Sequence, residues 1–358
     1  MKVIKPDYYD EFKCVSSDCK DTCCKGWEII VDEKTYNKYK ELNDEYKHDL
    51  FKNIATRNSE RVIMPKKDNE CPFLNESGLC DIYEKVGIDY LCQVCAKYPR
   101  FENIYANECD KGLFMSCMPV AELIAHHTDH IRFIETEEER ELNLSEIDAD
   151  LYVALKQIRG KCIDIVQDRQ YDIKTRVFML LDYAKKAQKC ISKGKYNGVQ
   201  NIIIDDFAQN GCSEAGSKDL KNVISTFLTF EILTMKWKIL LEEIFEFASV
   251  EKKNANYCNA NVYENFLVYM IYGYLLDAVY DKNLSGRVNA IISCMLIIAE
   301  VDRFRGNGNL DIFIDTIHLF SKEIEHCEEN VAQLFNLARG RTCFKDKSLA
   351  RMISRLNF

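Results

Sequence analysis

The chain has 358 residues, of which 47% are hydrophobic and 29% charged, and it contains only 14 glycines and 5 prolines. These figures are typical of a folded protein with long helices, and they argue against a disordered chain or a loop-rich all-β fold. The net charge of −9 and the lack of long basic runs argue against a nucleic-acid binder, because phosphate contacts need clustered lysine and arginine.

The first twelve residues lack the apolar core of a secretory signal. The most apolar stretches, residues 266–276 and 289–299, are too short to span a bilayer. We therefore expect no membrane association and a cytoplasmic location. In such a reducing compartment a cysteine pattern indicates metal binding or catalysis rather than disulfides.

The N-terminal third is expected to hold short elements around its cysteines. We expect residues 1–31 to be irregular, and an amphipathic helix is predicted over residues 32–54, because apolar residues recur there at three- and four-residue steps. The turn-forming residues 75–78 predict a small hairpin over 71–83, with Cys71 and Cys80 near its open end. A helical turn is predicted to stop before Pro99, and another helix to begin within 113–127.

From about residue 145 the periodicity becomes helical throughout. Helices are predicted over a stripe from Leu151 to Ile165 and near residues 174–192, 218–248, 262–281, 285–304 and 310–338. No alternating βαβ pattern is visible. The predicted fold is mostly α, with a cysteine-rich metal-binding module over residues 1–125 packed on a helical bundle over 126–358.

Cysteines are concentrated near the N-terminus, where ten of the 17 occur within about the first third of the chain. Four thiolates can bind a structural zinc ion or a cubane iron–sulfur cluster, and all-sulfur ligation suits both. The other seven are scattered singly and are interpreted as small buried hydrophobes: Cys162, Cys190, Cys212, Cys258, Cys294, Cys327 and Cys343.

Cys23 and Cys24 are adjacent. Successive side chains in an extended segment point to opposite sides, so the two thiols are awkward ligands for one small ion. They are better suited to two neighbouring sites, or to one site and one packing role.

Four segments occur in an order that resembles the flagellin lysine-N-methylase family: "FKCVSSDCKDTCCKGW" (12–27), "CPFLNESGLCDIY" (71–83), "LCQVCAKYPR" (91–100) and "SC" (116–117). The first two are also similar to a broader group of cysteine-cluster proteins. Two later segments resemble weaker motifs of the same family: "YENFLVYMIYGYL" (263–275) and "IEHCEEN" (324–330).

The resemblance implies methyl transfer from S-adenosylmethionine to lysine side chains of flagellin, and an iron–sulfur cluster of the 4Fe-4S type held by cysteines. The positions that match are Cys14, Cys19, Cys23, Cys24, Cys71, Cys80, Cys95 and Cys117. Eight ligands could supply two four-cysteine sites, or one cluster with several structural thiols, and zinc stays an alternative metal. Cys92 and Cys109 lie outside the family pattern. In the family, proline and glutamate directly follow the cysteine that matches Cys117, whereas Met118 intervenes here. No acid therefore matches the family position, and we interpret Glu122 as a surface residue.

Catalytic and cofactor-binding residues are not assigned by the sequence. The glycines of "RGNGNL" (305–310) follow no strand, so we expect a non-Rossmann cofactor surface between module and bundle. The compact three-cysteine motif of radical enzymes is absent. Glu325 and His326 are the most motif-like acid–imidazole pair, although an exposed glutamate beside a half-buried histidine explains them too. His126, His127 and His130 fit either partners of the metal ligands or a polar helix end.

Two functions from different classes therefore remain open. One is an S-adenosylmethionine-dependent methyltransferase acting on flagellin lysines. The other is a non-catalytic cysteine-cluster metalloprotein, with zinc or iron–sulfur, that has a structural, redox or metal-sensing role. The lack of a recognisable cofactor pocket in the sequence motivates the second.

Overall fold

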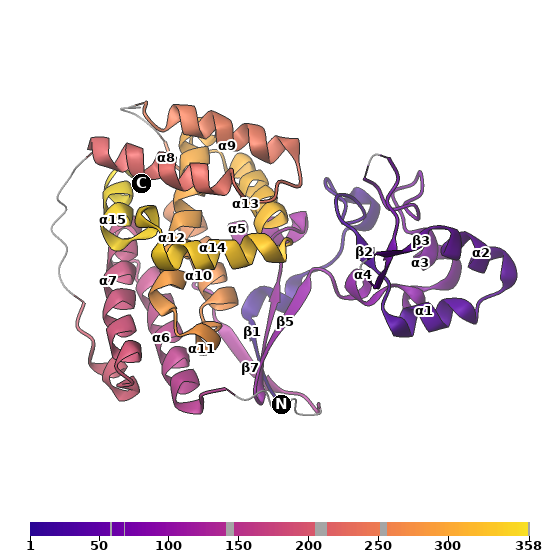
Figure 1. The fold of residues 1–358 in the computed structure, drawn as a ribbon, viewed down its shortest axis with the longest axis horizontal. Coiled ribbons are helices and arrows are strands. Elements are labelled where there is room, and N and C mark those ends of the chain that lie inside the picture. The colour runs from indigo at the N-terminus through magenta and orange to yellow at the C-terminus, as the bar shows by residue number, and fades with distance from the viewer. Residues whose placement is uncertain (58, 68, 141–146, 205–212, 251–255, 357–358) are drawn as a thin grey trace.

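A computed structural model describes residues 1–57, 59–67, 69–140, 147–204, 213–250 and 256–356. The chain forms a large, mainly helical lobe and a smaller lobe beside it (Figure 1). Each lobe has its own buried apolar cluster, and the cluster of the small lobe is built entirely from residues between Ile29 and Cys92. The prediction of a mostly α fold is confirmed.

A four-stranded sheet lies on the side of the large lobe that faces the small lobe (Figure 1). Its strand order is β5-β6-β1-β7, and β1 runs parallel to β6 and antiparallel to β7. The strands are β1 (Lys2–Pro6), β5 (Arg100–Tyr105), β6 (Glu108–Leu113) and β7 (Phe133–Glu137). The expectation that residues 1–31 are irregular is therefore wrong for β1, because Val3 pairs with Cys109 and Thr136, partners far away in the sequence.

Short elements build the small lobe. They are β2 (Ile29–Ile30), α1 (Glu33–Lys40), α2 (Asp44–Lys52), β3 (Ile54–Arg57), β4 (Glu60–Ile63), α3 (Asp81–Val86) and α4 (Gln93–Lys97), with 3₁₀ turns at Asp7–Glu11, Ser16–Asp18 and Ile88–Tyr90 before or between them. Strands β2, β4 and β3 form a second, antiparallel sheet.

Two of the local predictions here need correction. The predicted helix over 32–54 is two helices, which separate at Glu41–Asn43, although Asp32 does cap the first by accepting a hydrogen bond from the Thr35 N–H at 3.0 Å. The predicted hairpin over 71–83 is reduced to a turn, because α3 starts at Asp81. Asn75 Oδ1 closes that turn by accepting from the Ser77 and Leu79 N–H groups, both at 3.0 Å.

Helices make up most of the large lobe. They are α5 (Met118–His126), α6 (Ala149–Gln167), α7 (Ile173–Ser192), α8 (Ser213–Phe227), α9 (Met235–Phe247), α10 (Ala260–Tyr274), α11 (Ala278–Asp281), α12 (Leu284–Val301), α13 (Leu310–Ile324), α14 (Glu328–Gly340) and α15 (Asp346–Ser354), with 3₁₀ turns at Tyr196–Asn201 and Thr342–Phe344 and a π turn at Asp302–Gly306. Each of the predicted helices over 218–248, 262–281 and 310–338 is in fact two, and α15 was not predicted.

Helix α12 lies at the centre of this lobe. The segment Leu284–Gly306 is long and apolar enough to cross a membrane, but 94% of its most apolar window is buried inside the protein. Its environment is that of a core helix. Cys294, on this helix, is fully buried, as predicted for the scattered cysteines.

Buried ion pairs tie the layers of the large lobe together. Arg159 of α6 bonds Asp110 of β6, which fixes the sheet to the helices. Glu264 of α10 is fully buried and accepts from Arg176 at 2.6 Å and from Arg169 at 2.8 Å. Removing one partner of such a pair leaves the other charge buried and uncompensated.

Glu264→Gln should therefore lower the free energy of unfolding by about 3 kcal/mol or more, because Arg176 loses its charged partner inside the protein. Chemical denaturation of the purified protein measures this. Glu135→Gln is the control, since the Glu135 side chain pairs with Lys2 but is 60% exposed, and it should leave the midpoint unchanged. Equal midpoints for both variants would contradict the account.

Candidate functional site

The predicted ligand cysteines gather in the small lobe and at its junction with the large lobe. Cys14, Cys19, Cys23 and Cys24 lie between the first 3₁₀ turn and β2, and Cys71 and Cys80 flank the Asn75 turn. Cys95 lies on α4, and Cys117 is the residue before α5.

The first cysteine group consists of Cys14, Cys19, Cys23 and Cys117, because the Cys14 thiol contributes to the raised pKa of each of the other three. Burial, and then the neighbouring thiols of Cys19 and Cys14, raise the pKa of Cys117 to about 12. A hydrogen bond with Cys24, then burial, and then repulsion from Cys24, Cys14 and Cys117 raise the pKa of Cys23. The first group thus joins the loop after Phe12 to the start of α5.

The second cysteine group consists of Cys24, Cys71, Cys80, Cys92 and Cys95. Burial is the main cause that raises the pKa of Cys71 to about 12, and the thiols of Cys24, Cys80 and Cys92 add to it. A hydrogen bond with Cys92 is the largest cause of the raised pKa of Cys95, to which Cys24 and Cys71 also contribute. Cys92 was interpreted as an extra, but it lies within this group.

Two thiols of the second group are biased toward the thiolate. The hydrogen bond from Cys23 lowers the pKa of Cys24 to about 6, and the hydrogen bond from Cys95 lowers that of Cys92. The thiolate is the form that binds metals. The adjacent pair Cys23 and Cys24 is divided between the two groups, and their donor atoms are all sulfur. By donor type, sulfur ligands suit zinc or an iron–sulfur cluster. Within the described part of the chain, no three of these cysteine sulfur atoms lie within 4.8 Å of one another.

An ion-pair cluster links the cysteine loop to the large lobe. Asp21, between Cys19 and Cys23, accepts from Lys322 Nζ at 2.8 Å and bonds His318 Nε2 at 2.8 Å. Burial opposes ionisation of Asp21, yet the hydrogen bonds from His318 and Lys322 hold its pKa at about 2. Both partners belong to α13, so this helix determines where the loop sits.

His326, just beyond α13, packs into the same junction. Its ring lies 5.0 Å from that of Trp27, 5.7 Å from Tyr98 and 4.9 Å from Phe114, and its Nε2 bonds Ser116 Oγ. Burial, followed by repulsion from Lys322 and His318, lowers the pKa of His326 to about 4. It is therefore neutral at pH 7, and it touches the residue that precedes Cys117.

A pocket of about 510 Å³ adjoins this junction, between β5 and helices α10 and α14, and Phe114 belongs to both. Both of the later family-like segments contribute to its wall, the first through Tyr269, Gly273 and Tyr274 and the second through Glu325 and Glu328. The remaining lining residues are Phe101, Asn103, Phe114, Asp277, Asp281, Arg287, Val331, Ala332, Phe335 and Asn336.

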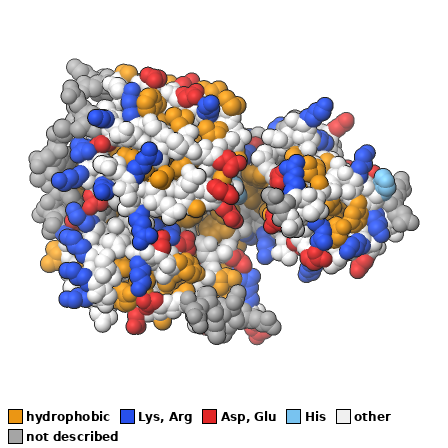
Figure 2. Space-filling view, viewed as in Figure 1, with side chains coloured by type: hydrophobic (Ala, Val, Ile, Leu, Met, Phe, Trp, Pro, Cys, Tyr) orange, Lys and Arg blue, Asp and Glu red, His pale blue; other side chains and the backbone are white. Residues whose placement is uncertain are grey.

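The pocket is acidic and aromatic. Four of its described lining residues are carboxylates and one is basic. That base, Arg287, is engaged by Asp281 at 3.2 Å and Asp277 at 3.7 Å. Tyr274 packs on Phe335 with ring centres 5.4 Å apart. Figure 2 shows acidic side chains gathered at the edge of the large lobe beside the constriction between the lobes.

Glu325 lies at the buried end of the pocket. It is only 9% exposed, and its Oε1 accepts from Tyr269 at 2.8 Å and from Tyr274 at 2.7 Å. Burial raises its pKa. The interpretation of an exposed glutamate beside a half-buried histidine is therefore wrong for Glu325. The two residues also do not act as a pair, because His326 faces the junction instead.

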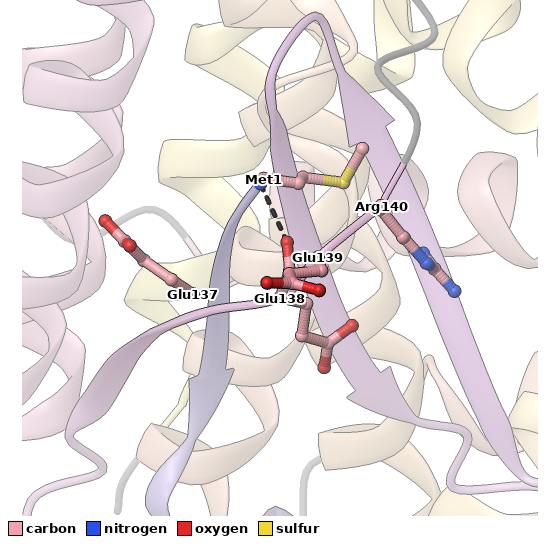
Figure 3. A pocket seen from close by; sticks show the side chains of 5 residues that line it. All are labelled: Met1, Glu137, Glu138, Glu139 and Arg140. Atoms are coloured by element: carbon pink, nitrogen blue, oxygen red, sulfur yellow. Dashed lines mark hydrogen bonds between the residues drawn. The ribbon is translucent and has the colours of Figure 1, made fainter.

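A second hollow, of about 740 Å³, lies beside the N-terminus and is lined by Met1, Glu137, Glu138, Glu139 and Arg140 (Figure 3). The Met1 ammonium donates to the Glu138 carbonyl at 2.9 Å. Arg140 pairs with Glu102 at 2.9 Å, and Glu138 with Lys111 at 2.5 Å. The aromatic wall of the first pocket has no counterpart among these lining residues.

The other candidates have ordinary roles. Glu122 pairs with Lys20 at 3.0 Å on the surface, as predicted. His126 and His130 are exposed, and His127 Nε2 lies 3.4 Å from Asp7. Among the remaining cysteines, Cys109, Cys162, Cys258, Cys294, Cys327 and Cys343 are buried, Cys190 is half-buried, and Cys212 lies outside the described residues. Cys327 also lies within 4.8 Å of Glu231 and Glu329, to which its thiol donates.

Sequence reasoning missed the tyrosines of the pocket and the α13 cluster. The chain has 19 tyrosines, which gave no reason to select Tyr269 and Tyr274. A usable signal was present at the end of α13, where His318 and Lys322 are four residues apart on one face of the helix and His326 follows at the same spacing just beyond its end.

The chain is similar to proteins of known description. Residues 159–352 match a family model described as the FliB lysine N-methylase C-terminal domain. The "Lysine-N-methylase" of Salmonella typhimurium is 27% identical over 204 residues, which cover 53% of this chain and 48% of the relative. The "Flagellar biosynthetic protein FliU" of Salmonella muenchen is 31% identical over 142 residues, 36% of this chain and 80% of the relative.

The chain thus spans about half the length of the curated lysine-N-methylases that it matches. No solved structure matches it. Apart from Phe101, Asn103 and Phe114, every residue that lines the 510 Å³ pocket falls inside the segment that the family model covers.

Asp21→Asn should loosen the cysteine loop, because it removes the charge that pairs with Lys322 and His318. We expect the local opening free energy of residues 14–27 to fall by about 1 kcal/mol, measured by hydrogen exchange. Asp18→Asn, an exposed carboxylate in the same loop, is the matched control and should change nothing. Unchanged exchange in Asp21→Asn would show that the ion pair does not hold the loop.

Proposed function

Because this chain belongs to the FliB lysine N-methylase family, we propose that it is a protein-lysine N-methyltransferase that acts on flagellin, with S-adenosylmethionine as the methyl donor. The proposal follows the names of its relatives, lysine-N-methylase and flagellar biosynthetic protein, and extends them to this chain. The reaction site we assign to it is the pocket between β5, α10 and α14.

One observation carries this assignment: two segments about 50 residues apart in sequence, 263–275 and 324–330, both resemble family motifs and both line the same pocket. A volume of about 510 Å³ is within the range of small-molecule sites. The wall of this pocket comes from β5 and the helices and not from the small lobe.

The charge of the pocket suits the two reactants. A sulfonium donor and a lysine ammonium are both cations, and four carboxylates face them against one arginine. Coulomb attraction is stronger in a partly dry cavity than in water. A pocket that holds the amine in line with the methyl group makes the reaction effectively unimolecular, which lowers its entropic barrier.

The cysteines complete the proposal as a metal module. All-sulfur donor sets and two thiols with lowered pKa values fit an iron–sulfur cluster, with zinc as the alternative. Cys14, Cys19, Cys23 and Cys117 would hold one site, and Cys24, Cys71, Cys80 and Cys95, with Cys92 beside them, a second. Bound metal would supply cross-links that fix the small lobe and the start of α5.

The alternative is a non-catalytic cysteine-cluster metalloprotein with a structural, redox or sensing role. It was motivated by the lack of a recognisable cofactor pocket. The acidic, aromatic pocket weakens that motivation, so the enzyme is favoured. Saturable binding of S-adenosylmethionine in calorimetry would count against the alternative, and its absence would support it.

Gly273→Leu tests whether the pocket is the reaction site. A side chain at Gly273 would point toward the ring of Phe101, whose nearest atom is 3.9 Å from the new Cβ, so it should fill the pocket without displacing the backbone. With metal-loaded, anaerobically prepared protein and flagellin from the same host, mass spectrometry should find methylated lysines for the wild type and at least ~100-fold less methylation for the variant.

Gly160→Leu is the matched control, since a side chain on this exposed glycine of α6 meets nothing within 4 Å. It should retain full activity. Unmodified flagellin with the wild type would overturn the proposed function. Full activity of Gly273→Leu would place the reaction elsewhere.

The two cysteine groups predict which cysteine substitutions lower the metal content and which do not. Cys23→Ser and Cys71→Ser each remove a ligand from a different group, so each should lower the metal content and the melting temperature. Cys294→Ser, in the core of the large lobe, should leave the metal content unchanged. Elemental analysis of anaerobically purified variants measures this, and equal metal loss in all three would contradict the assignment.

A further inference from the structure

Glu325 lies at the buried end of the pocket, and its two carboxylate oxygens differ in their hydrogen bonding. Both tyrosine hydroxyls bond the same atom, Glu325 Oε1, at 2.8 and 2.7 Å. The other oxygen, Oε2, is buried and accepts no well-aligned hydrogen bond within the described part of the chain, although the Ser321 hydroxyl lies near enough to the carboxylate to lower the pKa of Glu325. A buried carboxylate oxygen without a partner is costly, so such a group indicates a ligand that satisfies it.

We propose that Glu325, held by Tyr269 and Tyr274, binds the ε-ammonium group of the acceptor lysine and takes its proton before methyl transfer. This inference rests on the proposed function, because it assigns a role within the same pocket. Glu325 would be a catalytic residue, and the two tyrosines positioning residues.

The shape and chemistry of the pocket fit a lysine side chain. Phe101, Phe114 and Phe335 line it and can pack on the four-carbon stem of a lysine. The stem of a lysine ends in a cation, which needs a carboxylate partner. Glu325 is the most deeply buried of the four carboxylates that line the pocket. Arg287 does not compete for it, because Asp281 and Asp277 already engage that guanidinium.

The two tyrosines fix the carboxylate in one orientation. Both donate to Oε1, so a further donor would pair with Oε2, where the Ser321 hydroxyl is the competing side-chain donor to this carboxylate. Tyr269 is itself fixed, since its hydroxyl oxygen also accepts from the Met115 N–H at 3.5 Å. An ammonium that donates to Oε2 would complete the hydrogen bonding of the carboxylate.

The chemical step balances without another reactant. An N–H bond of the ammonium breaks, its electron pair stays on nitrogen, and the proton moves to Glu325 Oε2. The nitrogen lone pair then forms a bond to the methyl carbon, and the carbon–sulfur bond breaks with its electrons on sulfur, which leaves a neutral thioether. Burial raises the pKa of Glu325, which makes it a stronger proton acceptor than an exposed glutamate.

Glu325→Gln tests the role, because it keeps the shape but removes the charge and the basic oxygen. We expect kcat for flagellin methylation to fall at least ~100-fold, the usual scale for a lost general base. Binding of S-adenosylmethionine, measured by calorimetry, should change less than threefold (~0.6 kcal/mol). Glu323→Gln is the matched control: Glu323 is buried two residues earlier, on α13, but accepts from the Leu233 N–H at 2.9 Å, outside the pocket, and the kcat of this variant should be unchanged. Wild-type kcat in Glu325→Gln would overturn the proposal.

A second measurement separates this proposal from the proposed function. n-Pentylamine reproduces the stem and ammonium of lysine, and 1-pentanol is its neutral counterpart. In an NMR titration the wild type should bind the amine at least tenfold tighter than the alcohol. Both Glu325→Gln and the double variant Tyr269→Phe/Tyr274→Phe should lose this preference.

The titration has three possible outcomes. No preference for the amine in the wild type would overturn the lysine site. A preference that Glu325→Gln abolishes would support it, even if flagellin were not methylated and the proposed function failed. A preference that survives in both variants would place the ammonium site on other residues of the pocket.

Discussion

The contact between the end of α13 and the cysteine loop is the constraint on which both chemical regions of the molecule depend. Lys322 and His318 bind Asp21 in the loop that carries Cys19, Cys23 and Cys24, and His326 bonds Ser116, next to Cys117. The same chain segment then presents Glu325 to the pocket. The position of one helix end therefore sets the first cysteine group and the buried end of the pocket together.

If the cysteines bind metal as proposed, this arrangement would give the metal a role in positioning the pocket. If metal binding fixes the cysteine loop, it also fixes the partners of α13, and hence the location of Glu325. The pocket itself is built by the helices that the family model covers, with Phe101, Asn103 and Phe114 supplied by the sheet side. Two regions with different chemistry thus meet at one junction.

Helical periodicity allowed the main helices to be predicted, and the position of the Asn75 turn followed from its residue types. The four-stranded sheet could not be predicted, because β1 pairs with strands more than 100 residues away and its five residues carry too little pattern. The breaks inside the predicted helices depend on where the chain must turn to pack. The family resemblance pointed to the cysteines and to residues 263–275 and 324–330, but their division into two groups, and the meeting of the two segments in one pocket, depend on tertiary contacts.

The burial of Glu325 also could not be predicted from the sequence. A glutamate in "IEHCEEN" gives no sign that it is 9% exposed and held by two tyrosines from α10. Placing a carboxylate there costs free energy that hydrogen bonds offset only in part. Such a local exception to ordinary packing is where function is expected to lie.

The most direct test of the account is a crystal structure of the metal-loaded protein with S-adenosylhomocysteine, the product of the methyl donor. The account predicts that the ligand occupies the pocket between β5, α10 and α14, with its sulfur facing the side where Glu325 lies. A ligand bound elsewhere on the protein, with this pocket empty, would contradict the assignment of the reaction site.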